Sequence, residues 1–420
     1  MSLRPERVEL KGGGRVLFLR NAASPFISYH GSIPAGVAAE RAGEEGVAEF
    51  LARLLLSGTE RRSARQLAEG LEGLGATLEF RVAEDLLVFR GRCTRSVAPK
   101  AFRVLADVLT NPVLPAKEVE RVRADVLTDI ERERESTRER AEHEVLSLIY
   151  PGRHPYGRDP KGEPDRVKGI EPRALLEFHE RCYGRADMVL ALAGDVDAEF
   201  VGSTVAKAVH ALPAGGTPPR APAPVPGTPG TRFVDMPHKS QAEIALGLQA
   251  IPRLDPDFYA LNLANLMFGI IGMYGRLGMS VREEKGLAYY SYSHLRCLRA
   301  GGHWSIVAGV NPGRLEDAMA AISAELDRLR TEPFTADEIE TGKLNQVGAL
   351  VVNVERNAEV AAALHEIEFH GLGTDYLERF PAIVNGLTRE GILRAAERYF
   401  RKAGCSLAVV GPIGERTFSL

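Results

Sequence analysis

The chain has 420 residues, of which 45% are hydrophobic and 26% charged, which excludes fibrous and disordered classes and suggests two domains of about 200 residues. Its formal net charge of −3 gives no overall field that favours nucleic acid or an anionic membrane. No apolar run reaches the roughly 20 residues of a membrane span, and residues 1–20 lack a signal-peptide core. We expect a cytoplasmic protein, or a periplasmic or secreted one if a leader was removed.

Apolar periodicity predicts mixed elements in the first half of the chain. Strands are expected at residues 16–19, 27–33, 86–89 and 189–193, and helices at residues 46–56, 64–74, 98–109, 116–137 and 172–182. Paired helices beside short strands favour an α+β class, in which helices pack on one face of a mostly antiparallel sheet.

The segment 46–59, Gly-Val-Ala-Glu-Phe-Leu-Ala-Arg-Leu-Leu-Leu-Ser-Gly-Thr, resembles the zinc helix of the insulinase/pitrilysin peptidases, which are inverzincins. That helix carries His-x-x-Glu-His, and the matching positions here are Glu49, Ala52 and Arg53. Ala52 has no group that can take a proton from water, and Arg53 has no lone pair to give a metal. Glu49 and Arg53 have the favourable spacing for a helical ion pair. The resemblance therefore implies a degenerate zinc site, with no metal and no catalytic residue on this chain.

The third zinc ligand of the family is a Glu on a later helix, and the stretch from Glu120 to Ile130 resembles it. The matching position is Asp129, which is acidic but one methylene shorter. We hypothesise that Arg53 stands where zinc would be, with Glu49 and Asp129 as its anionic partners. The alternative is that Asp129 faces solvent on a charged helix. The mixed-charge run at residues 131–144 is expected to be a solvated helix face, with a binding patch as the alternative.

A proline-rich linker is expected at residues 214–230, and it divides the chain into domains at residues 1–213 and 231–420. The segment 180–194 aligns without a gap with 397–411, and the segment around 111–120 echoes 332–340. Two matches in register predict an internal duplication, hence two homologous domains.

The second half is predicted to have the same mixture of elements. Strands are expected at residues 242–248, 303–308 and 406–410, and helices at residues 256–268, 315–330, 335–352 and 358–370.

The segment 281–289, Val-Arg-Glu-Glu-Lys-Gly-Leu-Ala-Tyr, resembles the family segment that supplies an Arg and a Tyr seven residues apart. Just upstream, residues 265–277 resemble the family's glycine-bearing loop. In relatives these side chains bind the substrate backbone and the developing oxyanion, so the resemblance gives these roles to Arg282 and Tyr289. The alternative is a local ion pair for Arg282 and an ordinary strand residue for Tyr289.

The resemblance spans most of the chain and fails at the zinc helix. It implies a non-catalytic subunit, in the bacterial small-subunit class related to mitochondrial processing peptidase. The expected partners are a zinc-bearing homologous subunit, which would hold the only zinc, and an extended peptide substrate. The chain alone is expected to be inactive, and homodimers in isolation are an open alternative. The rival hypotheses are a structural or assembly subunit and a peptide-binding protein without a proteolytic role.

Overall fold

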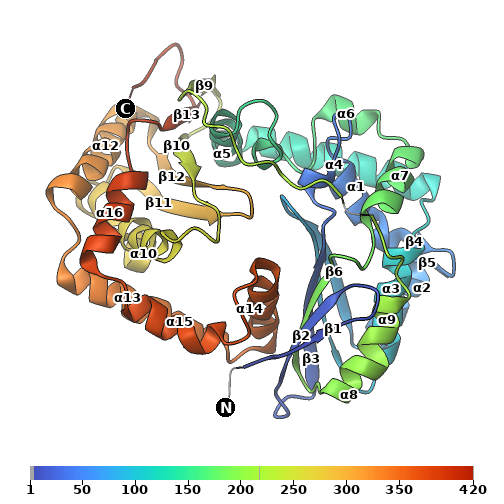
Figure 1. Ribbon diagram of the computed structural model, residues 1–420. Coiled ribbons are helices and arrows are strands. Elements are labelled where there is room, and N and C mark those ends of the chain that lie inside the picture. Colours follow the sequence, from blue (N-terminus) through green and yellow to red (C-terminus); the bar gives the residue numbers. More distant parts are fainter. Residues whose placement is uncertain (1–3, 217, 420) are drawn as a thin grey trace. The chain divides into compact units, whose positions relative to one another are not determined.

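The computed structural model describes residues 4–216 and 218–419, which form two compact units. The first unit contains the described residues up to 130, together with 159–221 and 350–379. The second contains 131–158, 222–349 and the described residues from 380 onward. Each half of the sequence thus contributes one segment to the unit that is built mainly from the other half (Figure 1).

The sheet of the first unit has the strand order β1-β2-β8-β3-β7-β6. Its strands are β1 (Glu6–Glu9), β2 (Arg15–Arg20), β3 (Phe26–Ile33), β6 (Thr77–Val82), β7 (Leu87–Thr94) and β8 (Val189–Gly194). Only the β2–β8 pair is parallel among the described strands of this sheet. A short hairpin, β4 (Gly58–Thr59) and β5 (Arg62–Ser63), lies outside it.

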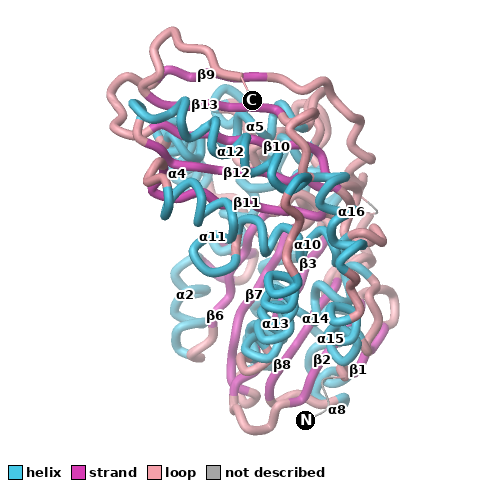
Figure 2. Tube along the Cα trace, turned by 90° about the vertical axis from the view of Figure 1, so that its left-hand side faces the viewer, coloured by secondary structure: helices cyan, strands magenta, loops and turns pink. Residues whose placement is uncertain are grey.

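The sheet of the second unit has the strand order β11-β12-β10-β13-β9, so β11 is an edge strand (Figure 2). Its strands are β9 (Thr231–Asp235), β10 (Ala242–Ala250), β11 (Ala288–Cys297), β12 (Gly302–Val310) and β13 (Ser406–Gly411). Within the described part of this sheet, β9 and β13 are the one parallel pair. The expectation of an α+β fold with mostly antiparallel sheets is confirmed in both units.

Helices cover both faces of the first sheet, so the expectation that helices pack on one face alone is wrong: the second face is covered by a helix from the other half of the sequence. One face packs against α1 (Val47–Leu54), α3 (Ala98–Thr110) and α7 (Pro172–Cys182) in the larger core. The opposite face, with Leu17 and Ala191, packs against Val360 and Leu364 of α14 (Asn357–His370). The other α-helices of this unit are α2 (Ala64–Gly73), α6 (Pro164–Lys168), α8 (Ala198–Phe200) and α9 (Ala206–His210).

The second sheet is covered in the same way. One face packs against α10 (Phe258–Gly269), α12 (Leu315–Thr331) and α16 (Arg389–Tyr399), and α11 (Ile271–Gly278) follows α10. On the opposite side, α5 (Thr137–Ile149) contacts β10 and β13. Helices α4 (Ala116–Glu135), α13 (Ala336–Asn353) and α15 (Tyr376–Asn385) each contain a point where the chain passes from one unit to the other.

We call α5 and α14 the exchanged helices, because each comes from one half of the sequence and packs on the sheet built mainly from the other. Helix α5 follows α4, and α14 follows α13. The sequence match between residues 118–120 and 338–340 makes these two helix pairs equivalent. The two exchanged helices therefore lie at equivalent positions of the internal repeat, which supports the proposed duplication.

The mixed-charge run at residues 131–144 was expected to be one solvated face, and this prediction is wrong at its end. The helix breaks at Ser136, whose Oγ accepts a hydrogen bond from Glu139 N and caps α5. Glu144 is only 5% exposed and pairs with Arg140 at 2.7 Å and Arg232 at 3.5 Å. Charge pairing lets this carboxylate lie against the sheet, which a count of charged letters does not reveal.

No helix in the described ranges 4–216 and 218–419 has the length and apolar character needed to cross a membrane.

A buried histidine on the exchanged helix α14 predicts acid sensitivity. His365 is 1% exposed, its Nε2 lies 2.7 Å from Ser32 Oγ, and its ring lies 4.8 Å from that of His30. The pKa of His365 is lowered to about 3. Burial is the largest cause, the charge of the neighbouring His30 is the next, and the opposing effect of Glu366 is smaller. An unfolded histidine titrates near pH 6.5, so the folded state loses stability as pH falls from about 6.5 toward 3.

We expect the free energy of unfolding to fall by about 2 kcal/mol from this group between pH 7.5 and pH 5, since each unit of pKa difference corresponds to about 1.4 kcal/mol. Urea denaturation at both pH values measures it. His365→Asn removes the titrating ring and should lose less stability on acidification than wild type. The control His238→Asn changes a side chain that is 58% exposed and should behave like wild type. Equal acid losses in all three proteins would contradict the assignment.

Candidate functional site

Helix α1 holds the three positions that match the zinc motif. Its N-terminus is fixed by Glu40, whose Oε1 accepts hydrogen bonds of 3.1 Å from the backbone N of Gly46 and of Ala48. Gly46 has φ +95°, and a Cβ there would lie 2.5 Å from Lys161 O, so only glycine fits. Phe50 and Leu51 are buried in the core. The position of α1 is therefore fixed by hydrogen bonds at its N-terminus and by its buried side chains.

Arg53 joins the two acidic positions. Its Nε lies 2.7 Å from Glu49 Oε1, and its Nη1 lies 2.7 Å from Asp129 Oδ2 on α4. The side chains of Arg53, Glu49 and Asp129 are 29%, 17% and 28% exposed. Burial alone lowers the pKa of Arg53, but hydrogen bonds to Asp129 and Glu49 outweigh it and raise the pKa above its ordinary value. The ion pairs hypothesised from the sequence are present.

Zinc does not fit these residues. A guanidinium that is always charged lies between the two carboxylates, and Ala52, which is 6% exposed, offers no donor atom. The described ranges 4–216 and 218–419 contain no group of three or more His, Cys, Asp or Glu side chains that could hold a metal ion. Arg53 supplies the positive charge between the two carboxylates.

Arg53→Met should reduce the free energy of unfolding by about 2 kcal/mol, because it leaves Glu49 and Asp129 as two close carboxylates without their shared cation. Chemical denaturation at pH 7.5 measures the loss. Arg65→Met is a matched control, since Arg65 forms an i,i+4 pair with Glu69 at 2.6 Å but is 85% exposed. The control should lose at most about 0.5 kcal/mol. Equal effects would mean that the Arg53 cluster is an ordinary surface network.

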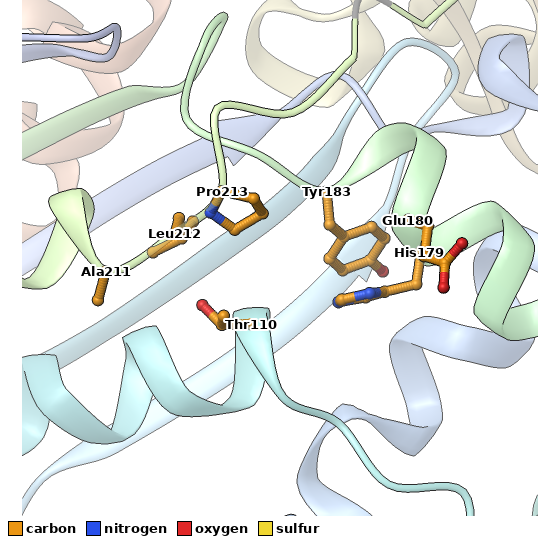
Figure 3. A pocket seen from close by; sticks show the side chains of 7 residues that line it. All are labelled: Thr110, His179, Glu180, Tyr183, Ala211, Leu212 and Pro213. Carbon is orange, nitrogen blue, oxygen red and sulfur yellow. The ribbon is translucent and has the colours of Figure 1, made fainter.

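A shallow pocket of about 410 Å³ lies elsewhere in the first unit, between the ends of α3, α7 and α9 (Figure 3). Its lining residues are Thr110, His179, Glu180, Tyr183, Ala211, Leu212 and Pro213. Tyr183 is fully buried and its hydroxyl has no hydrogen-bond partner among residues 4–216 and 218–419, while His179 Nε2 lies 2.9 Å from Leu109 O. Burial lowers the pKa of His179 and raises that of Tyr183, so both rings are neutral near pH 7. None of the functional-site residues predicted from the sequence lines this pocket.

Arg282 lies in a short π-helical turn, Met279–Glu284, that leads into the edge strand β11. The turn is closed by hydrogen bonds from Gly286 N to Arg282 O at 3.0 Å and from Leu287 N to Val281 O at 2.9 Å. The Arg282 side chain is 33% exposed, and its Nε lies 3.5 Å from Glu283 Oε1. The upstream residues 265–277, expected as a loop, are mostly helical and form the end of α10 and nearly all of α11.

Tyr289 is presented at the surface by a β-bulge. In the pairing of β11 with β12, Ala288 lies opposite Val310 and Tyr290 opposite Gly309, so Tyr289 is the additional residue. Its side chain is 64% exposed. Bulges redirect side chains in this way and are frequent beside functional sites. Strand β11 begins one residue earlier, at Ala288, and the sequence pattern alone does not indicate the bulge.

The structure brings Glu49, Ala52, Arg53 and Asp129 together in the first unit, and it places Arg282 and Tyr289 in consecutive elements of the second. Sequence reasoning overlooked Tyr290, which is anchored two strands away. The two consecutive tyrosines, Tyr289 and Tyr290, are the feature of the sequence that could have indicated Tyr290. The structure pairs Tyr290 with Gly309 in the neighbouring strand.

Comparisons with known proteins agree with the family that the sequence resembles. The sequence profile of the insulinase family, peptidase family M16, matches residues 15–155, and that of the peptidase M16 inactive domain matches residues 169–345. An uncharacterized zinc protease of Mycobacterium tuberculosis is 28% identical, over 99% of this chain and 95% of the relative. One of Streptomyces coelicolor is 25% identical, over 89% of this chain and 82% of the relative.

Solved structures have the same fold. A peptidase M16 inactive domain protein from Pseudomonas fluorescens superposes with a TM-score of 0.92 at 25% identity, covering 99% of this chain and 98% of that one. A protease from Helicobacter pylori superposes with a TM-score of 0.88 at 21% identity, covering 97% and 99%. With both profiles matching in order and relatives aligned along nearly the whole chain, this protein belongs to the insulinase family, peptidase family M16.

Proposed function

We propose that the chain is the non-catalytic subunit of a heterodimeric zinc metallopeptidase, to which it supplies Arg282 and Tyr289. The observation that carries the proposal is the contrast between two segments. In the helix that matches the family's zinc helix, Arg53 bridges Glu49 and Asp129, and a guanidinium cannot ligate a metal. In the second unit, Arg282 and an exposed Tyr289 keep the family pattern.

Arg282 and Tyr289 contribute hydrogen-bond donors that need no metal on this chain. A guanidinium near a peptide carbonyl orients the substrate backbone, and a phenol hydroxyl aimed at the attacked carbonyl stabilises the oxygen as charge develops on it. Zinc on the partner subunit would supply the activated water. The substrate class is an extended peptide, which would pair along a sheet edge of that partner with little sequence preference.

Purified chain alone should not hydrolyse a quenched fluorescent peptide, because Arg53 occupies both acidic positions through ion pairs and Ala52 offers no base where the family motif has its Glu. The same chain mixed with a zinc-bearing M16 homologue from the same genome should hydrolyse it faster than the homologue alone, and a zinc chelator should stop the reaction. Chelator-sensitive hydrolysis by the single chain would overturn the assignment. Failure to bind or stimulate any such homologue would favour an assembly or peptide-binding role instead.

A further inference from the structure

Tyr290, the residue after the exposed Tyr289, forms a hydrogen bond with a residue two strands away from its own strand. Tyr290 lies opposite Gly309 on β12, and Gly309 lies opposite Glu243 on β10, so the three residues form one row across three strands. The Tyr290 hydroxyl donates to Glu243 Oε1 at 2.7 Å. Neighbouring strands lie about 4.8 Å apart, so the tyrosine side chain crosses the middle strand to reach the third.

Gly309 makes this crossing possible. A Cβ at position 309 would lie 2.8 Å from Tyr290 Cζ and 2.3 Å from Gln241 Nε2. Gln241 Nε2 donates to the same Glu243 Oε1 at 2.6 Å. Glu243 is 1% exposed, so the acceptor is fixed in the sheet and shielded from water. Tyr290 therefore has a defined place that any larger residue at position 309 would block.

Arg138 of the exchanged helix α5 covers the same ring. Its guanidinium carbon lies 5.4 Å from the ring centroids of both Tyr290 and Tyr292. It also donates to Tyr292 Oη at 2.5 Å and to Glu142 Oε1 at 3.0 Å. The ring of Tyr290 is thus held from above by a cation and from its tip by a carboxyl group.

This anchor decides the register at the bulge. Without the extra residue, Tyr289 would lie opposite Gly309 and take the place that Tyr290 occupies. Ala288 faces the core opposite Val310, while Tyr290 faces α5. Residues two apart share a face in a regular strand, so the bulge at Tyr289 reverses the faces of the residues that follow it. Two consecutive tyrosines compete for one position, and the anchored one determines which of them is exposed.

We propose that Tyr290, Glu243 and Arg138 are positioning residues, which hold the bulge so that Tyr289 is presented to substrate. Their catalytic consequence rests on the function proposed above, whereas their effect on the bulge does not. Two measurements separate these claims.

The first measurement uses the isolated chain labelled with 3-fluorotyrosine, in which the resonance of Tyr289 among the 11 tyrosines is identified by its loss in Tyr289→Phe. Tyr290→Phe and Gly309→Ala should both shift or broaden that resonance. Tyr399→Phe is the matched control, because Tyr399 also donates to a carboxylate, Asp257 Oδ2 at 3.2 Å. An unchanged Tyr289 resonance in both variants of the anchor overturns the inference, whatever the catalytic result.

The second measurement is a double-mutant cycle in the chain mixed with its zinc-bearing homologue. Tyr290→Phe should lower kcat/KM about tenfold, comparable to losing one hydrogen bond to a charged group. In a chain that already carries Tyr289→Phe it should have little further effect, since the positioned group is absent. A purely structural role would instead give additive losses, which would overturn the inference. Tyr289→Phe could leave kcat/KM unchanged while Tyr290→Phe and Gly309→Ala shift the fluorine resonance of Tyr289. In that case the positioning of Tyr289 by Tyr290 is supported and the proposed function fails.

Discussion

Replacement of Tyr289 by phenylalanine should lower kcat/KM of the reconstituted pair about a hundredfold, because loss of one donor to a developing oxyanion raises the barrier by about 2.7 to 4 kcal/mol. The effect should fall mainly on kcat, since the negative charge develops only in the transition state. Tyr289 is 64% exposed, so the substitution should leave stability nearly unchanged. Hydrolysis of a quenched peptide, with circular dichroism as the folding check, measures both.

Arg282→Gln tests the second donor in the same assay, and its loss should appear more strongly in KM, because a guanidinium on a substrate carbonyl acts in the ground state as well. Arg314→Gln is a suitable control, since Arg314 also pairs with a nearby carboxylate, Asp317 at 2.7 Å, and is 52% exposed. Activity that is unchanged in both Tyr289→Phe and Arg282→Gln would favour a structural or assembly subunit over a shared active site.

Rebuilding the family motif should create a zinc site in this chain. The quadruple variant Glu49→His, Ala52→Glu, Arg53→His and Asp129→Glu places two imidazoles on one face of α1 and lengthens the acidic side chain on α4. Residues 53 and 129 already approach within 2.7 Å through a long arginine, and the extra methylene at position 129 compensates in part for the shorter histidine. We expect one zinc per chain after dialysis, measured by atomic emission, against none in wild type.

The matched control is the triple variant that retains Arg53, which should bind no zinc because the guanidinium remains between the ligands. A quadruple variant that folds but retains no metal would show that the backbone around α1 and α4 has moved away from ligand geometry. Stoichiometric zinc on the wild-type chain would remove the basis of the non-catalytic assignment.

Several features were accessible from sequence because they depend on residue type and local spacing. The periodicity located most helices and central strands, including the helix at residues 46–56 that the structure resolves into α1 and a following 3₁₀ turn. The i,i+4 spacing of Glu49 and Arg53 was sufficient to predict their ion pair. Helix α5 was missed because its start lies inside a charge run, where a single serine cap separates it from α4.

The sequence by itself determined that positions 52 and 53 offer neither a metal ligand nor a base, because alanine and arginine lack the necessary lone pairs in any conformation. It also determined the repeat, which is a property of the letters alone. Only the tertiary structure decided that Asp129 closes the cluster from 76 residues away, that α5 and α14 exchange sheets, and that Tyr290 rather than Tyr289 occupies the place above Gly309. Those outcomes depend on packing between distant segments, where register and pairing are set by partners that local spacing does not specify.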